Sequence, residues 1–380
     1  MNRVVIFGNI VMTEDATRNS ILCSSFHKSA DEYLKNTINF GFAKPEASPL
    51  TKVLYACLFS WLRWIVLFIK YLFMPEHNIL FVPYPSHMDG WLACILGKIY
   101  HKIVIIDAFI GLYDTLVSDR GLIKKKSVLA KLIWQYEKCL LSWADIILVD
   151  TDLNGLMLKK AYGLPRTQVK AIPVGIDENL WKPYRNEKKL PFTVIFWCTF
   201  IPLHGAEVVA HSAKLLMRTD PDIKFIIIGT GQEAENFYSR VKELQLNNLV
   251  WIRRFISMKK IYNLMKKSHC CLGVFGNRNK TQRVIPYKVY QALASSQPVI
   301  TANTEAAHQL LTHGKNAFLV NPNDPESLAE AILALKDDEK FAIHLGINGR
   351  RLYEKKLSNN AIDKKISEIL KMPVDKNKCR

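Results

Sequence analysis

Short apolar runs rich in valine and isoleucine recur along almost the whole chain, with helical stretches between them. Runs such as "RVVIFGN" (3–9) and "KIVIIDAF" (102–109) do not alternate apolar with polar residues. Strands of this kind are typically buried on both faces, as in a parallel sheet with helical crossovers. We interpret these runs as strands: 3–9, 78–84, 102–109, 145–151, 169–175, 192–200, 224–231, 248–255, 269–276 and 298–303. The pattern predicts an α/β fold with doubly wound parallel sheets.

This alternation breaks at the polar, proline-containing stretch 175–191. A chain of 380 residues is also too long for one ordinary core, so two domains are expected. The expected division is a first domain over 1–176, a linker over 177–191, a second domain over 192–355, and a C-terminal helix and tail over 356–380. Because ligands of such sheets bind beyond the carboxyl ends of the strands, polar residues at strand ends are the candidates for function.

The charge and the cysteines narrow the class of protein. A formal net charge of +18 favours anionic partners, namely nucleic acid, acidic lipid or phosphorylated small molecules. The chain has no zinc finger, RNA-recognition signature or concentrated basic arm, so we expect no nucleic-acid partner. The eight cysteines form no C-x-x-C pair, which predicts reduced core residues of a cytosolic protein, with disulfides or a metal site as the alternative. No His/Cys cluster has the spacing of metal ligands, so we expect no metal and no cofactor.

Residues 51–74 form a long apolar stretch rich in Trp, Phe and Tyr, with the length of a membrane span. Arg63 argues against a span, because a charge at mid-bilayer is costly. In a helix, Lys52, Arg63 and Lys70 share one stripe, which fits a helix lying in a membrane interface with its basic stripe among anionic headgroups. One alternative is an ordinary helix packed against the first sheet, and another is a true membrane span.

The stretch "TQRVIPYKVYQALASSQPVIT" (281–301) predicts a loop, a short helix entered through Pro286, and a buried strand. Arg283 precedes this helix and Lys288 lies in its first turn, where there is no Asp or Glu. A helix N-terminus offers free N–H groups and a partial positive charge, so this acid-free turn suits a diphosphate. The alternative for the two cations is a solvated basic loop.

Several motifs resemble those of family 4 glycosyltransferases, which have the GT-B fold. The end of their first domain is similar to "VKAIPVGID" (169–177), and the start of their second to "FTVIFWCTFIPLHGAEVVAHSAKLL" (192–216). "FIIIGTGQE" (225–233) resembles their next unit, and "RVIPYKVYQALASSQPVIT" (283–301) their donor-site helix. The resemblance implies two Rossmann-like doubly wound parallel-sheet domains facing a cleft. It also implies a retaining, metal-independent transfer from a nucleotide diphosphate sugar, which is a co-substrate rather than a cofactor.

This resemblance is strong over 170–370 and weak over 1–165. It implies that Arg283 and Lys288 neutralise the departing diphosphate. Many family members carry two Glu eight positions apart, where this chain has Arg283 and Gln291. Gln can still hydrogen-bond a ribose hydroxyl, without charge. The other positions that the resemblance places near the donor are Gly8, Asn9, Thr199, His204, Gly205, Gly229, Arg253 and Pro286.

The first domain is implied to hold the acceptor and to close on the donor. Asp107 ends a central strand, where the family often has a His, and is our candidate for a polar group in the reaction centre. A helix cap or a turn is the alternative for this Asp. Arg18 is a further candidate for contact with a charged acceptor, against an ordinary exposed Arg. The acceptor-side candidates are His87, Asp89, Asp114 and Arg120, with helix capping or local ion pairing as their alternative.

The sequence therefore predicts a hexosyltransferase-like enzyme that moves a sugar from a nucleotide diphosphate sugar to a saccharide or lipid-linked acceptor. We expect it in surface polysaccharide or glycolipid synthesis, in the cytoplasm and peripheral at the inner face of the cell membrane. The alternative is a non-catalytic protein of the same fold that binds nucleotides or saccharides, because the Glu pair is missing. A nicotinamide-dependent dehydrogenase is disfavoured, because "GTGQEA" (229–234) has only the first two glycines of G-x-G-x-x-G.

Overall fold

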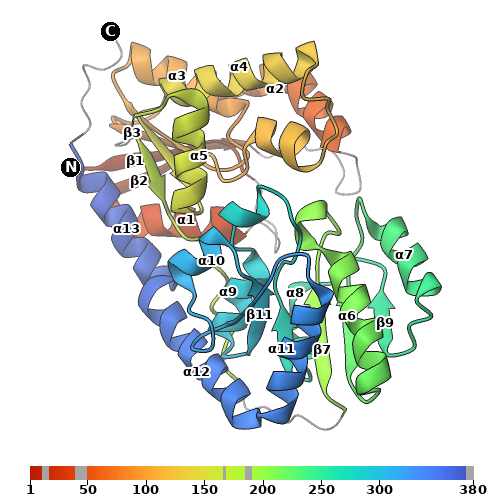
Figure 1. Ribbon diagram of the computed structural model, residues 1–380. Helices are drawn as coiled ribbons and strands as arrows, with labels where there is room; N and C mark the ends of the chain where they lie inside the picture. Colours follow the sequence, from red (N-terminus) through yellow and green to blue (C-terminus); the bar gives the residue numbers. More distant parts are fainter. Residues whose placement is uncertain (11–16, 39–48, 166–167, 185–190, 374–380) are drawn as a thin grey trace. The chain divides into compact units, whose positions relative to one another are not determined.

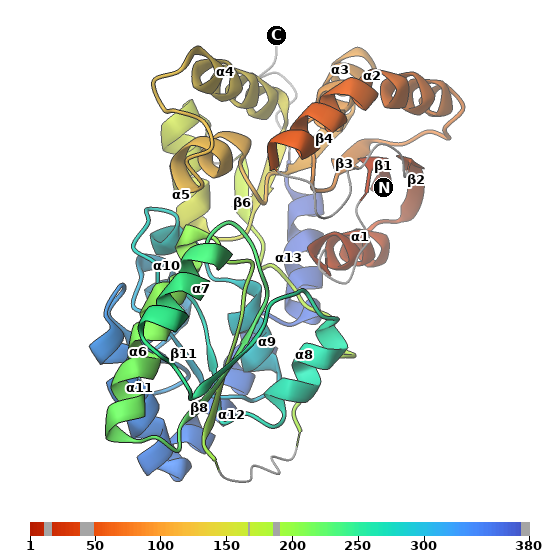
Figure 2. The same ribbon diagram turned by 90° about the vertical axis from the view of Figure 1, so that its right-hand side faces the viewer.

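The computed structural model describes residues 1–10, 17–38, 49–165, 168–184 and 191–373, with only the backbone of 49–58. The chain divides into two units, shown in Figures 1 and 2. Unit 1 comprises Met1–Val174 and Asn359–Arg380, and unit 2 comprises Gly175–Ser358. Each unit contains one six-stranded sheet, and every strand pair in both sheets is parallel.

The sheet of unit 1 has the strand order β2-β1-β3-β4-β5-β6. Its strands are β1 (Arg3–Asn9), β2 (Glu32–Ile38), β3 (Ile79–Val82), β4 (Ile103–Asp107), β5 (Ile146–Val149) and β6 (Val169–Ala171). Its helices are α1 (Thr17–Ser29), α2 (Pro49–Leu72), α3 (Asp89–Ile99), a short π-helix (Asp114–Asp119), α4 (Val128–Trp143), α5 (Asp152–Tyr162) and α13 (Asn359–Lys371). Because β2 and β3 flank β1, the direction of winding changes between β1 and β3.

Helices cover both faces of this sheet, which explains the unbroken apolar strands. One face packs against residues of α2, α3, α4 and α5, such as Leu67, Leu92 and Leu140. The other face packs against α1 and α13, through residues such as Phe26 and Ile366. Phe26 also stacks on Phe81 of β3, with ring centres 4.1 Å apart.

The sheet of unit 2 has the strand order β12-β11-β10-β7-β8-β9. Its strands are β7 (Thr193–Trp197), β8 (Lys224–Ile228), β9 (Leu249–Ile252), β10 (Cys270–Leu272), β11 (Val299–Ala302) and β12 (Phe318–Val320). Its α-helices are α6 (Ala206–Thr219), α7 (Ala234–Glu243), α8 (Met258–Met265), α9 (Tyr287–Ala294), α10 (Glu305–Leu310), α11 (Pro325–Asp337) and α12 (Glu339–Lys356). Single 3₁₀ turns span Pro202–His204 and Thr281–Arg283. Here the winding changes direction between β7 and β10.

The predicted α/β fold with two doubly wound parallel sheets is confirmed, and each predicted apolar run contains a strand. β2 was not predicted, because "EYLKNTI" is a half-buried edge strand without an apolar run. β12 was not predicted either, because it is only three residues long. The C-terminal helix α13, which the sequence assigned to neither domain, packs against α1 in unit 1.

The apolar stretch 51–74 forms most of the helix α2, as expected. The prediction that Arg63 lies on an exposed basic stripe of this helix is wrong. The guanidinium of Arg63 is buried inside unit 1, 3.3 Å from the carboxylate of Asp89. Lys70 is exposed and donates to the carbonyl of Thr37, whereas the side chain of Lys52 lies outside the described residues. Among the described residues, no helix combines the length and apolar character needed to cross a membrane.

Candidate functional site

The loops after β7 and β10 meet at the point where the sheet of unit 2 changes its direction of winding. The N–H groups of Phe275 and Gly276 donate to the carbonyls of His204 (3.1 Å) and Leu203 (3.2 Å). Gly205 has a φ of +65°, and a Cβ there would lie 2.5 Å from the nitrogen of Gly276. Only glycine therefore allows the two loops to approach so closely. In sheets of this kind, such a junction is where ligands bind.

Lys288 of α9 is the main cation of this junction. Its side chain is only 4% exposed, and its ammonium nitrogen has no hydrogen-bond partner among the described residues. The nitrogen lies 4.3 Å from the centre of the Phe196 ring, on β7. Burial lowers the pKa of Lys288 to about 8, although neighbouring Cys198 acts in the opposite direction. A buried ammonium without an acceptor is costly, and an arriving anion would relieve that cost.

The start of α9 carries no acid in its first turn, as the sequence predicted. Pro286 is its N-terminal cap, with an extended backbone, and no side chain bonds to the cap. Arg283 lies in the preceding 3₁₀ turn, is partly exposed, and donates from Nε to the carbonyl of Asn279 at 3.2 Å. A helix N-terminus without an acid, together with these two cations, gives the start of α9 a positive electrostatic character.

Gln291 lies one turn further along α9 and is buried. Its Oε1 accepts a hydrogen bond from the indole nitrogen of Trp197 at 3.2 Å. Trp197 in turn lies parallel to Trp181, with ring centres 6.3 Å apart. The predicted contact of Gln291 with a ribose hydroxyl stays a prediction. In such a contact the side-chain amide of Gln291 would bind the ribose and Trp197 at the same time.

The other predicted donor residues of unit 2 are spread over the strand ends. Thr199 is exposed in the loop after β7, and His204 is buried in the following 3₁₀ turn. Gly229 follows β8 with a φ of +121°, where a Cβ would overlap the carbonyl of Cys198. Arg253 follows β9, lies over the rings of Tyr238 and Trp251, and pairs with Glu235 at 2.7 Å. Their roles toward a donor stay predictions.

In unit 1, the equivalent junction between β1 and β3 is held by Asp89. Its carboxylate accepts a hydrogen bond from the backbone N–H of Asn9 at 2.8 Å and pairs with Arg63. A Cβ on Gly8 would lie 3.0 Å from the Cβ of Asp89, so this glycine leaves the room that Asp89 occupies. Asp89 is 2% exposed. Asp89 therefore positions the loop after β1. Its carboxylate is buried, so the structure gives no support to the predicted contact with an acceptor.

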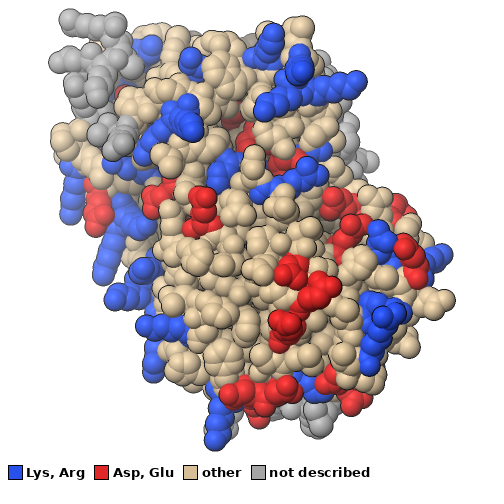
Figure 3. Space-filling view, in the orientation of Figure 1, with Lys and Arg blue, Asp and Glu red and all other residues tan. Residues whose placement is uncertain are grey.

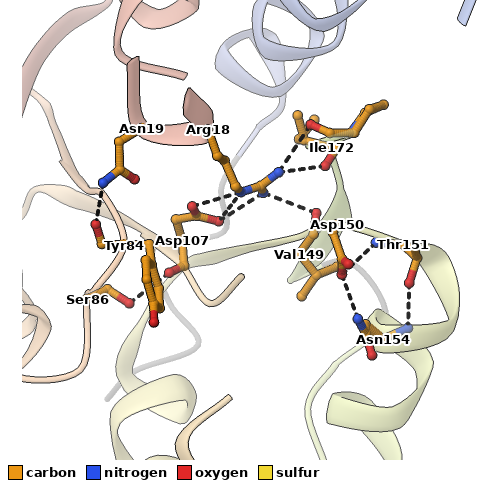
Figure 4. Close-up of polar contacts among 11 residues, drawn as sticks. Arg18, Asn19, Tyr84, Ser86, Asp107, Val149, Asp150, Thr151, Asn154 and Ile172 are labelled. Atoms are coloured by element: carbon orange, nitrogen blue, oxygen red, sulfur yellow. Dashed lines mark hydrogen bonds and ion pairs between the residues drawn. The ribbon is translucent and has the colours of Figure 1, made fainter. Parts of the chain in front are cut away.

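Asp107 forms a buried ion pair with Arg18, drawn in Figure 4. The guanidinium contacts both carboxylate oxygens of Asp107, at 2.9 Å from Nη2 and Nε. It also donates to the carbonyls of Val149, Ile172 and Pro173. Burial raises the pKa of Asp107, and the positive charge of Arg18 opposes that rise. Arg18 is thus not an exposed arginine, and this pair ties α1 to the ends of β4, β5 and β6.

His87 contacts a buried acid, Glu137, that was not predicted from the sequence. Glu137 of α4 accepts hydrogen bonds from the N–H groups of Leu112 (2.7 Å) and Tyr113 (2.9 Å) and from the hydroxyl of Tyr162 (2.7 Å). The Nε2 of His87 lies 3.3 Å from the same carboxylate. Glu137 therefore fixes both the loop after β4 and the imidazole of His87.

Asp114 and Arg120 bound the short π-helix that follows this loop, and both are partly exposed. Their acceptor roles stay predictions. No signal in the sequence separated Glu137 or Phe196 from ordinary helix and core residues. Among the described residues, no cluster of His, Cys, Asp or Glu has a geometry that could hold a metal ion.

Comparison with known proteins gives one family and several structural relatives. Residues 177–352 match the family model described as glycosyl transferases group 1. An uncharacterised glycosyltransferase of Methanocaldococcus jannaschii is 26% identical over 161 residues, which cover 42% of this chain and 43% of that relative. The capsular polysaccharide biosynthesis glycosyltransferase CapM of Staphylococcus aureus is 28% identical over 161 residues, with 42% and 40% covered. The chain thus spans less than half the length of these two relatives.

Solved structures match over nearly the whole chain. The Anabaena protein HepE in complex with UDP gives a TM-score of 0.70 at 15% identity, with 97% of this chain and 99% of that chain covered. The sucrose-phosphate synthase of Thermosynechococcus elongatus gives 0.71 at 15% identity, with 97% and 98% covered. This likeness establishes the fold, which is the predicted GT-B fold.

Proposed function

Because residues 177–352 match the family model of the glycosyl transferases group 1, we propose that the protein transfers a sugar from a nucleotide diphosphate sugar to a saccharide or lipid-linked acceptor. In this reaction the bond between the anomeric carbon and the diphosphate breaks, and the acceptor oxygen forms the new bond while its proton passes to the departing phosphate or to solvent. The nucleoside diphosphate leaves with the bonding electrons. The main requirement on the protein is therefore to stabilise negative charge on the departing phosphate.

The observation that carries this proposal is the buried ammonium of Lys288, which has no hydrogen-bond partner among the described residues. It lies in the first turn of α9, at the junction of the β7 and β10 loops. Because the turn has no acid and no side chain caps it, a diphosphate placed there meets the positive end of the helix. Arg283 adds a second cation from the preceding turn.

We further propose that the transfer is retaining and needs no divalent metal, because Lys288, Arg283 and the helix N–H groups supply the neutralising charge. A uridine nucleotide is the first donor to test, because the structural relative HepE was solved with UDP. We place the reaction in the cytoplasm, at the inner face of the cell membrane, where polysaccharide acceptors are assembled on lipids.

The test is calorimetric titration and thermal shift of the full chain with UDP, UDP-glucose and the other common nucleoside diphosphates and their sugar conjugates. A ligand at 100 times its dissociation constant stabilises by about 2.7 kcal/mol, which moves a midpoint by several degrees. We expect a base-selective shift that Lys288→Met abolishes, since methionine keeps the apolar stem over Phe196 and removes the charge. Lys340→Met, an exposed lysine of α12, is the matched control and should bind as the wild type does.

Release of nucleoside diphosphate in the presence of candidate acceptors then separates the enzyme from the non-catalytic alternative. Binding without turnover by any donor and acceptor pair would favour a nucleotide-binding protein. If no nucleotide shifts the midpoint, or if Lys288→Met binds as tightly as the wild type, the proposed donor site is wrong.

A further inference from the structure

Helix α2 presents an apolar stripe to solvent. Trp61, Ile65 and Ile69 of α2 and Phe73, just beyond its end, follow one another at intervals of four residues, and they are 59%, 50%, 50% and 83% exposed. The opposite side of the helix packs into unit 1 through Leu67. The charge of Arg63 is thus turned inward and the apolar side chains outward, which is the reverse of an ordinary surface helix.

Helix α4 presents a second stripe of the same kind. Val128 and Leu132 are 73% and 62% exposed. Exposed lysines flank them in the sequence "KKKSVLAKL" (124–132). Helix α3 lies between α2 and α4 and contacts both, so the three helices form one layer on the same side of the sheet (Figures 1 and 2). We call the outward side of this layer the outer face.

The charge of the outer face has one sign. The sequences of α2, α3 and α4 contain only two acids, Asp89 and Glu137, which are 2% and 1% exposed. Over the described side chains of these helices, every exposed charge is therefore a lysine. At the end of α3, the ammonium of Lys98 lies 3.8 Å from the centre of the Trp143 ring of α4. Figure 3 shows blue side chains among tan ones over the α3 and α4 end of unit 1.

We propose that the outer face binds the surface of an anionic lipid bilayer, with the α2 stripe inserted among the acyl chains and the α4 lysines among the headgroups. Apolar and aromatic side chains beside lysines are the chemistry that such an interface accepts. A second copy of the chain fits less well, because a two-fold interface through this face would bring lysines against lysines.

This inference rests on the proposed transfer and adds a direction of approach for its acceptor. Helix α4 starts at the end of the segment that follows β4, at the carboxyl edge of the sheet. A bilayer on the outer face would therefore lie beside the loop that Glu137 fixes, where the first unit is proposed to bind a lipid-linked acceptor.

The test is flotation of the full chain with vesicles of phosphatidylcholine alone and with vesicles that also contain phosphatidylglycerol. One variant replaces Ile65, Ile69 and Phe73 by Ser, and another replaces Lys124, Lys125, Lys126 and Lys131 by Gln. Matched controls on other elements are Ile343→Ser with Ile347→Ser, and Gln at the exposed Lys340, Lys355, Lys356 and Lys371. We expect binding only to anionic vesicles, reduced roughly tenfold or more by either test variant and by salt, and unchanged in the controls.

The proposal is overturned if the wild type ignores anionic vesicles, or if both test variants bind them as the wild type does. A concentration-dependent dimer that the α2 variant dissociates would assign the face to a second copy instead. Thermal shift with UDP is run on every variant, because an unchanged shift shows that the chain is folded. A normal UDP shift without vesicle binding would contradict only the proposed binding to a bilayer. Vesicle binding without a shift by any nucleotide would contradict the proposed function.

Discussion

The ammonium nitrogen of Lys288 lies 4.3 Å from the centre of the Phe196 ring. The ring face offers partial compensation for the buried charge, worth about 2 kcal/mol when desolvated. Burial nevertheless lowers the pKa of Lys288 from 10.5 to about 8, which corresponds to roughly 3 kcal/mol of lost stability at neutral pH. The protein without nucleotide therefore contains a destabilising buried charge at the place where we propose that the donor phosphate binds.

Lys288→Met should stabilise the protein without nucleotide by about 1–3 kcal/mol at pH 7, while it removes nucleotide binding. Below pH 8 both the folded and unfolded states carry the charge, so the cost is fully present. Between pH 8 and 10.5 the folded state binds fewer protons than the unfolded state, so stability rises with pH and the difference from the variant shrinks. Urea unfolding of both proteins across this range measures the difference. A variant less stable than the wild type at pH 7 would mean that the ammonium is already satisfied.

Nucleotide binding should take up protons above pH 8. A bound diphosphate favours the charged form of Lys288, so its pKa rises again in the complex. The association constant for UDP should then fall by close to tenfold per pH unit above pH 8. Titration calorimetry in two buffers of different ionisation enthalpy measures the proton uptake directly. Equal heats in both buffers at such a pH would contradict this assignment.

Arg63→Met should destabilise unit 1 by about 3–5 kcal/mol, because it leaves the carboxylate of Asp89 buried without its cation. Asp89→Asn added to this variant should recover a large part of the loss. The amide oxygen still accepts the N–H of Asn9, and no charge remains. A double-mutant cycle by denaturant unfolding gives the coupling energy. Additive losses in the double variant would show that the pair does not act as a unit.

Glu137→Gln should cost about 1–3 kcal/mol at neutral pH, since the carboxylate accepts four hydrogen bonds. Burial acts to raise the pKa of Glu137, but the hydrogen bonds from His87, Tyr162 and Tyr113 outweigh it and lower the pKa below 4.5. The stability that the ionised group contributes is present above pH 4.5 and is lost as pH falls through the folded value. Unfolding curves of the two proteins should thus converge in acid, and a constant gap would contradict the assignment.

The strands and the acid-free turn of α9 could be predicted, because both depend on local sequence. Unbroken apolar runs indicate burial on both faces, and the start of α9 needs only Pro286 and the residues beside it. The partners of buried charges could not be predicted in this way. Arg63 and Asp89 are 26 residues apart, and Arg18 and Asp107 are 89 residues apart.

The error on α2 has the same cause. A helical wheel shows that Arg63 and Lys70 share a stripe, but not which stripe faces the sheet. Hydrophobicity alone would have turned the apolar side inward. Here Asp89 needs a cation inside unit 1, and the buried pair with Arg63 turns that side of the helix toward the core. This arrangement leaves Trp61 and Ile65 outside.

The return of α13 to unit 1 sets an order of events during translation. Its Asp363 accepts hydrogen bonds from Ser25 and Lys28 of α1, and Ile366 completes a core that includes Phe26. Unit 2 is encoded between the two segments of unit 1, so its residues 175–358 are synthesised before α13. The part synthesised first is therefore the last to be completed, and the part of its sheet that α13 covers stays exposed in nascent unit 1 until the end of synthesis.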